Sequence, residues 1–221
     1  FYTLTSEGIW YYYFNKPSCS RHHALVHVIG KKASNEVVDT LSTKQPDIIL
    51  FSNYRSRKSF YNSHLLPEIY QFVYQNYRPY KLIGNHWFWK RSSRGMDGAQ
   101  TVELDVISSM ASPKYNSSKA FVTIDGILGL QTINKIDGIY IAADDSEVPL
   151  AFAVNDESMT RVKSGFLETL WSLDIPMVNV LAETKTFQLW GYFSGKHERV
   201  RIGQSFSLDH SKINITSGYS Q

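Results

Sequence analysis

The chain has 221 residues, of which 43% are hydrophobic and 19% charged, so it can bury a sizeable core and is too apolar for bulk disorder. Cys19 is the single cysteine, which excludes an intrachain disulfide and a cysteine zinc site. No apolar run reaches the roughly 18–20 residues that a membrane-spanning helix needs.

The first 91 residues alternate between strand and helix patterns. Apolar runs predict strands at residues 1–4, 24–29 and 47–51. Helical spacing predicts three helices: one capped by Thr5 or Ser6 and stopped at Asn15-Lys16-Pro17, one capped by Ser34, and one around Ile69. A hairpin over residues 80–90 follows them. We therefore predict a small, mainly parallel, three-layer α/β domain over residues 1–91.

Residues 92–100 form a polar, glycine-bearing linker, after which helical periodicity almost disappears. Turn residues then separate eight short runs with strand patterns, at residues 101–106, 120–124, 138–142, 148–154, 165–170, 177–182, 187–192 and 206–208. Eight short strands at this spacing are typical of a β-sandwich. The predicted fold class is therefore α/β followed by all-β, with a β-sandwich domain over residues 101–221.

The net charge of +3 hides an asymmetry between the two halves of the chain. Residues 1–91 hold 7 Lys and 5 Arg against 5 acids, a net charge of +7, whereas residues 92–221 carry a net charge of −4. Such a change of sign supports two modules with different neighbours. A basic module suits an anionic lipid, a phosphate or a nucleic acid.

The usual catalytic signatures are missing from the sequence. It contains no G-x-S-x-G elbow, no phosphate-binding loop, no G-x-G-x-x-G and no H-E-x-x-H. The histidines of the first half are His22, His23, His27, His64 and His86. Their spacing does not match a known ligand set, so we expect no metal site and no cofactor.

Aromatic residues alternate on two of the predicted strands. Trp87 and Trp89 share one face of their strand, and Trp190 and Tyr192 share one face of theirs. Exposed, such rings can stack on a sugar, but aromatic strand residues usually lie in the core. We therefore expect all four side chains to be buried.

The loop of residues 52–63 is the strongest candidate for a binding surface. It follows the third predicted strand and so lies at the carboxyl edge of the sheet, where open α/β sheets bind ligands. Its expected binding residues are Arg55, Arg57, Lys58, Tyr54 and Tyr61. The planar fork of an arginine binds two phosphate oxygens at once, so this loop suits an anionic partner. The alternative is a solvated connection between two elements.

Three stretches of the first half resemble one family: "YTLTSEGIWYYYFNKPSCSR" at 2–21, "KQPDIILFS" at 44–52 and "LPEIYQFVYQNYRPYKLIGNHWFWKR" at 66–91. The family comprises bacterial polytopic membrane proteins of the lipid-linked-sugar glycosyltransferase type, related to protein mannosyltransferases. Its extracytoplasmic segments carry an "N-x-P…R" turn, which is matched here by Asn15-Lys16-Pro17 with Arg21. The resemblance adds Arg21 to the expected binding residues.

The second half resembles a β-rich module that is appended to some members of the family. The matching pieces are "FVTIDG" at 121–126, "DGIYIAADDSEVPLAF" at 137–152 and "SGF" at 164–166. Relatives continue "IDG" with a tryptophan and an alanine, whereas this chain has Ile127 and Leu128.

The resemblance implies a C-terminal extracytoplasmic region on the periplasmic face of the bacterial inner membrane. Catalytic acids of the family lie in the membrane-embedded part, so the chain itself is expected to be non-catalytic. It would help to position a saccharide or a lipid-phosphate-linked sugar. Its expected partner is the membrane-embedded part of the same polypeptide, and no nucleic acid is expected. Two alternatives stay open: a free-standing carbohydrate- or protein-binding module, and an enzyme with an unrecognised site.

The loop of residues 52–63 predicts salt-sensitive binding to anionic lipid. Vesicles containing phosphatidylglycerol should bind the triple variant Arg55→Ala, Arg57→Ala, Lys58→Ala more weakly than the native chain at low salt. The reason is that each Lys or Arg near an anionic bilayer contributes about 1 kcal/mol. The difference should shrink at 1 M salt, where the screening length is only about 3 Å. Cosedimentation with vesicles measures the binding of the native chain and of the variant at each salt concentration. Equal binding by the two chains would mean that the loop is only a solvated connection.

Overall fold

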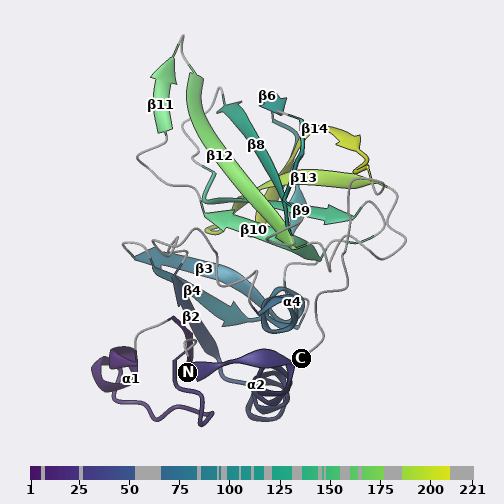
Figure 1. Ribbon diagram of the computed structural model, residues 1–221. Coiled ribbons are helices and arrows are strands. Elements are labelled where there is room, and N and C mark those ends of the chain that lie inside the picture. Colours follow the sequence, from purple (N-terminus) through teal and green to yellow (C-terminus); the bar gives the residue numbers. More distant parts are fainter. Residues whose placement is uncertain are drawn as a thin grey trace. The chain divides into compact units, whose positions relative to one another are not determined.

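The computed structural model describes residues 1–5, 8–24, 27–52, 66–83, 86–93, 95, 99–104, 106–110, 112–116, 121–130, 136–143, 146, 148–154, 160–163, 166–176 and 186–209. These residues form fourteen strands and three helices (Figure 1). The chain divides into two compact units: unit 1 is Phe1–Gly98 and unit 2 is Ala99–Gln221.

Unit 1 contains one four-stranded sheet with the order β1-β2-β4-β3. Its strands are β1 (Tyr2–Leu4), β2 (Ile48–Ser52), β3 (Tyr77–Ile83) and β4 (His86–Arg91). Strand β1 pairs with β2 in parallel, whereas β2 with β4 and β3 with β4 are antiparallel. The hairpin of β3 and β4 therefore lies beside β2, within the sheet.

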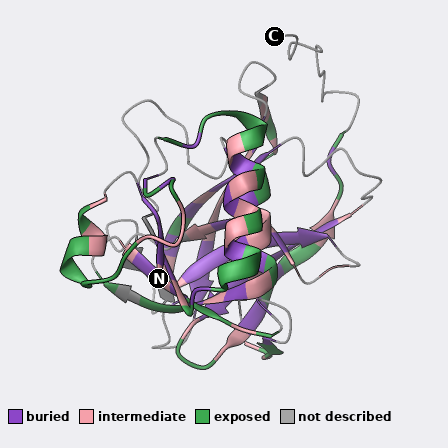
Figure 2. Cartoon of the chain, turned by 90° about the horizontal axis from the view of Figure 1, so that it is seen from below, coloured by how far each residue is buried: buried purple, intermediate pink, exposed green. Residues whose placement is uncertain are grey.

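Two longer helices, α2 (Gly30–Lys44) and α4 (Pro67–Asn76), cover one face of this sheet. Helix α2 buries Ser34, Val37 and Leu41, which recur every three or four residues, and Figure 2 shows its stripes of buried and exposed residues. Trp87 and Trp89 of β4 point to the same face and have no exposed surface. The ring of Tyr74 in α4 lies 5.6 Å from that of Trp89. The expected burial of both tryptophans is confirmed.

The short helix α1 (Ile9–Tyr13) contacts the opposite face of the sheet. His86 and Phe88 alternate with the two tryptophans on β4, so their side chains leave the strand on the other side. The ring of Trp10 lies 4.6 Å from that of His86, and Phe14, directly after α1, lies 5.9 Å from Phe88. Only part of α1 is used for packing, and none of its residues is buried.

The structure corrects three local predictions in unit 1. The described residues of the run 24–29 form no strand; the amide of His27 donates to the carbonyl of Ala24 in a turn. Helix α1 begins after Gly8, so neither Thr5 nor Ser6 is its cap. Helix α2 begins at Gly30, which places Ser34 inside the helix. Lysine and alanine are good helix formers, and the sequence Lys-Lys-Ala extends α2 by one turn upstream.

The predicted fold class is wrong. The described chain is mostly β, with three small sheets and three helices, rather than a mainly parallel α/β domain followed by a β-sandwich. In unit 1 only β1 and β2 are parallel. The described residues of the run 24–29 form no strand, and the sheet instead pairs β2 with β4 of the antiparallel hairpin.

Unit 2 contains two small sheets. The first has the order β10-β9-β13-β14-β5, with β14 and β5 parallel, and the second has the order β11-β12-β8-β6, with β7 also paired to β8. The strands are β5 (Gln100–Thr101), β6 (Val106–Met110), β7 (Lys114–Asn116), β8 (Phe121–Leu130), β9 (Gly138–Ala143), β10 (Pro149–Val154), β11 (Thr160–Lys163), β12 (Phe166–Pro176), β13 (Phe187–Phe193) and β14 (Glu198–Phe206).

The two sheets of unit 2 share one hydrophobic core. Buried side chains from β8 and β12, such as Ile124 and Leu173, belong to the same cluster as Ile141 of β9 and Leu189 of β13. Gly191 of β13 faces this cluster as well, because a Cβ at that position would lie 2.4 Å from Cδ1 of Ile136. Burial of this cluster supplies the main stabilisation of unit 2.

Strand lengths in unit 2 differ from those predicted. The turn expected after Ile124 does not form, and β8 continues through Asp125 and Gly126 to Leu130. The carboxylate of Asp125 accepts hydrogen bonds from Lys114 Nζ at 2.6 Å and from Ser172 Oγ at 2.7 Å. Because neighbouring strands supply these hydrogen-bond donors, the carboxylate of Asp125 is compatible with a position inside the sheet, and β8 continues past it.

Tyr192 is buried as expected, but Trp190 is only partly buried. The guanidinium carbon of Arg199 lies 4.2 Å from the ring centroid of Trp190. Arg199 also donates from Nε to Thr101 Oγ1 at 3.1 Å. A cation, rather than an apolar side chain, therefore lies against this tryptophan.

Gly95 generates a stability prediction for unit 1. Its φ is +53°, and a Cβ there would lie 2.3 Å from the carbonyl oxygen of Gln75 in α4. Gly95→Ala should therefore lower the free energy of unfolding by about 1–3 kcal/mol, because a strained backbone and a clash with fixed main chain add. Gly195→Ala is the matched control, since no atom lies within 4 Å of its Cβ position. Urea unfolding followed by tryptophan fluorescence compares them, and equal midpoints would contradict the clash.

Candidate functional site

One of the six predicted binding residues lies in the described part of the chain. Arg21 follows the "N-x-P" turn and precedes His22, on the segment between α1 and α2. The other five, Tyr54, Arg55, Arg57, Lys58 and Tyr61, lie outside the described residues. The structure therefore gives the geometry of Arg21 and its surroundings.

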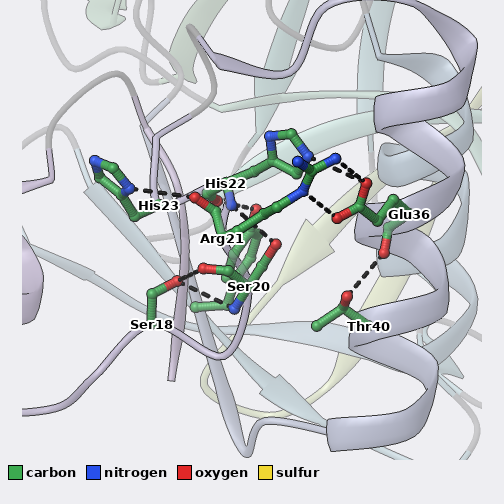
Figure 3. A network of polar contacts seen from close by, with 8 residues as sticks. Ser18, Ser20, Arg21, His22, His23, Glu36 and Thr40 are labelled. Carbon is green, nitrogen blue, oxygen red and sulfur yellow. Dashed lines mark hydrogen bonds and ion pairs between the residues drawn. The ribbon is translucent and has the colours of Figure 1, made fainter.

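The segment before Arg21 is fixed by local hydrogen bonds (Figure 3). Ser18 Oγ donates to the carbonyl of Ser20 at 2.7 Å and accepts from the amide of the same residue at 3.2 Å. Ser20 Oγ in turn accepts from the amide of His22 at 3.1 Å. Hydroxyl groups that bond to nearby main chain stabilise turns of this kind. The turn fixes the main chain around Arg21 and therefore the direction of its side chain.

A buried tyrosine ties this segment to the sheet. The hydroxyl of Tyr2, on β1, donates to the carbonyl of His22 at 2.8 Å, and both groups are buried. Burial raises the pKa of the Tyr2 hydroxyl well above its usual value, because the charged phenolate is poorly solvated there. Tyr2 therefore stays a neutral donor, and its role is to hold the segment.

Arg21 forms a two-pronged ion pair with Glu36 of α2 (Figure 3). Its Nε donates to Oε1 at 2.5 Å and its Nη2 donates to Oε2 at 2.6 Å. Parallel bonds from a guanidinium to a carboxylate are among the stronger polar contacts in proteins. The pair therefore joins the segment to α2 and occupies two donors of the arginine that the sequence suggested for ligand binding.

The side chain of His22 approaches the same carboxylate from the protein interior. His22 is buried, and its Nε2 lies 3.6 Å from Oε2 of Glu36, which is longer than a hydrogen bond. Glu36 is thus flanked by an exposed arginine and a buried imidazole. Thr40 Oγ1, one turn further along α2, donates to the main-chain carbonyl of Glu36 at 2.8 Å.

Two ionisable groups close to Arg21, in space or in sequence, have shifted pKa values. Hydrogen bonds from Arg21 lower the pKa of Glu36 to about 2, because they stabilise the charged carboxylate. Burial raises the pKa of the Cys19 thiol, because the thiolate is less well solvated there. A raised thiol pKa opposes nucleophilic reactivity at neutral pH. The cluster is suited to holding structure rather than to covalent or acid–base chemistry.

A second feature of unit 1 is the α1 surface, which we define as Ile9, Tyr12, Tyr13 and Phe14. The exposed fractions of these side chains are 51%, 82%, 65% and 41%. Trp10, Tyr11 and Phe14 contact the sheet or its first strand, whereas Tyr12 and Tyr13 are the most exposed of these aromatic residues. A group of large apolar side chains that are exposed side by side is uncommon on a protein surface that faces only water.

Unit 1 carries many exposed cations. Those in the described residues are Lys16, Arg21, Lys31, Lys32, Lys44, Lys81, Lys90 and Arg91. Over its full length unit 1 holds 13 Lys and Arg against 6 acids, a net charge of +7, and unit 2 has a net charge of −4. The division in charge thus follows the division into compact units.

The described residues contain no group of three or more His, Cys, Asp or Glu that could hold a metal ion. Within the same residues, no helix is long and apolar enough to cross a membrane.

Sequence reasoning missed the roles of Glu36, His22 and Tyr2. Glu36 lies 15 residues after Arg21, and no motif links the two positions. The identity of the partner depends on where α2 begins, which the sequence placed a turn too late. A carboxylate on the exposed side of a helix gives no signal in the sequence that a distant arginine will pair with it.

Comparison with protein-family models, with curated proteins and with solved structures finds no match to this chain.

The Arg21–Glu36 pair predicts a pH-dependent contribution to stability. The pKa of Glu36 in the folded chain, about 2, lies below its unfolded value of 4.5, so the contribution is present above about pH 4.5. It should be lost as the pH falls through about 2. The difference in unfolding free energy between the native chain and Glu36→Gln should therefore be constant from pH 5 to 8 and vanish near pH 2. Asp39→Asn, an exposed acid on the same helix, is the control. If the difference in unfolding free energy between the native chain and Glu36→Gln does not change with pH, the ion pair is contradicted.

Proposed function

We propose that the chain is a non-catalytic extracytoplasmic region of a membrane-bound, glycosyltransferase-like protein and helps to position a lipid-phosphate-linked sugar or its saccharide acceptor. In this proposal the membrane-embedded part of the same polypeptide carries the reaction. Unit 1 lies next to the anionic surface on the periplasmic side of the bacterial inner membrane.

The observation that carries this proposal is the separation of charge between the two units. Unit 1 has a net charge of +7, and its described cations are mostly exposed, whereas unit 2 has a net charge of −4. A surface that carries an excess of cations attracts the phosphate of a lipid-linked donor and the anionic head groups around it. The acidic unit 2 has no such attraction to an anionic surface.

The ion pair of Arg21 supports a positioning role rather than a catalytic one. Two of the guanidinium donors of Arg21 bind Glu36, and the hydroxyl of Tyr2 binds the main chain at His22. The segment is therefore attached to the rest of unit 1 at two points. A rigid support suits a region that presents a ligand to a reaction centre elsewhere in the protein. The predicted phosphate contacts are then the cations of the loop, Arg55, Arg57 and Lys58.

Nanodiscs provide a test of donor recognition. The chain should bind nanodiscs that contain a polyprenyl-phosphate-linked sugar at least about tenfold more tightly than nanodiscs of equal charge that contain phosphatidylglycerol, a factor of ten being about 1.4 kcal/mol. The triple variant Arg55→Ala, Arg57→Ala, Lys58→Ala should lose this preference. The matched control, Lys31→Gln, Lys32→Gln, Lys44→Gln, removes three exposed cations of α2 in the same unit and should keep it.

Two results would contradict the proposal. Equal binding to both kinds of nanodisc would remove donor recognition. Turnover of the lipid-linked sugar by the chain alone, abolished by one point mutation, would make the chain an enzyme.

A further inference from the structure

The α1 surface holds four of the seven large hydrophobic side chains that are exposed in the described residues of unit 1. Three aromatic rings and one isoleucine project from a five-residue helix and the residue that follows it, and none of the helical residues is buried. Tyr12 and Tyr13 are the most exposed of the four, and their rings contact each other at 6.0 Å. The described unit leaves these rings outside its own core.

The α1 surface is rigidly presented. Trp10 and Phe14 contact His86 and Phe88 of the sheet, and Phe1 contacts both Tyr11 and Phe14, at 5.8 and 4.9 Å. The hydroxyl of Tyr11 accepts a hydrogen bond from the amide of Thr3 on β1 at 3.2 Å. One side of α1 is therefore fixed to the sheet, which leaves Tyr12 and Tyr13 pointing away from it.

A cation lies close in sequence to the α1 surface. The first turn of α1 contains no acid, and the exposed Lys16 lies three residues after the helix. The imidazole of His23 lies 3.3 Å from the Cβ position of Gly8, which precedes α1, and its ring contacts that of His27 at 4.9 Å. Exposed aromatic rings next to a cation, within a unit of charge +7, match the head-group layer of an anionic bilayer.

We propose that the α1 surface docks unit 1 onto an anionic phospholipid bilayer, with Tyr12 and Tyr13 entering the head-group region. This inference rests on the proposed function, in which unit 1 lies at the membrane, and it names the contact. Tyrosine suits this layer because its ring leaves water while its hydroxyl stays hydrated. The apolar contact contributes at any ionic strength, whereas Lys16 and the other cations contribute at low salt.

Charge favours the bilayer over a second copy of the chain as the occupant of this surface. Two copies that meet through α1 bring two units of charge +7 together, and this repulsion opposes a dimer. An anionic bilayer has the complementary sign and accepts the aromatic rings without a shaped partner surface.

Vesicles of phosphatidylcholine and phosphatidylglycerol without any sugar lipid test the docking. At 1 M salt, where charge is screened, the native chain should still cosediment with the vesicles. The double variant Tyr12→Ser, Tyr13→Ser should lose at least about tenfold in affinity, about 1.4 kcal/mol. Met110→Ser, Leu170→Ser is the matched control, because these exposed apolar residues of unit 2 have exposed fractions of 40% and 41%. The control should bind like the native chain, and all three chains should unfold at similar temperatures.

A second measurement reports insertion directly. In a chain with Cys19→Ser and Tyr12→Cys, a polarity-sensitive dye on the new thiol should shift its emission to shorter wavelength when vesicles are added. The same dye at Leu170→Cys should not shift. Dye emission that stays unchanged at both positions would overturn the docking.

The remaining outcomes separate the docking from the proposed function. Equal binding by the native chain and the double variant at 1 M salt would overturn the docking. A dimer of the native chain that the double variant loses, with vesicle binding unchanged, would assign the α1 surface to a second copy instead. If the preference for nanodiscs with the lipid-linked sugar persists in either case, the proposed function stands without this contact.

Discussion

Strand β4 carries the constraint on which unit 1 depends, because its two faces have different partners. Trp87 and Trp89 have no exposed surface and pack on the side of α2 and α4, while His86 and Phe88 contact Trp10 and Phe14 on the other side. The alternation of side chains along a strand produces this division. The buried ring of Trp89 contacts Tyr74 of α4, and the partly buried His86 and Phe88 contact Trp10 and Phe14. The exposed aromatic surface of α1 is thus a consequence of how β4 sits in the sheet.

The segment between α1 and α2 depends on polar rather than apolar contacts. The described residues between α1 and α2 form no strand, and this segment is held by the Tyr2 hydroxyl, by the serine turn and by the bonds of Arg21 to Glu36. Exposed ion pairs contribute little by themselves, but a two-pronged pair that joins two elements restricts where each can go. These bonds attach the segment between α1 and α2 both to β1 and to α2.

In unit 2, polar side chains on the outer face of one sheet form hydrogen bonds between neighbouring strands. Thr123 donates to Asp174 at 2.5 Å, and Ser172 and Lys114 bind Asp125, all between neighbouring strands. These pairs allow β8 and β12 to run for ten and eleven residues above the shared core. On the other sheet, Arg199 lies against Trp190, a side chain that was expected to be buried and is only partly so.

The sequence by itself determined the elements whose signal is local. The helix around Ile69, the strand through Ile49 and Leu50, the hairpin ending in "HWFWK" and the burial of Trp87 and Trp89 were all predictable, because spacing and apolar runs report directly on which residues leave water. The unequal charge of the two halves was also readable from composition. Only the tertiary structure decided the rest. Residues 24–29 have the composition of a strand, but the described residues of this run form none, and the hairpin of β3 and β4 pairs with β2. From the sequence, Arg21 was expected to bind a ligand. In the folded chain it pairs with Glu36 of α2, 15 residues further along the sequence. Pairing of strands and of distant charges depends on which segments meet in space, and the local sequence does not contain that information.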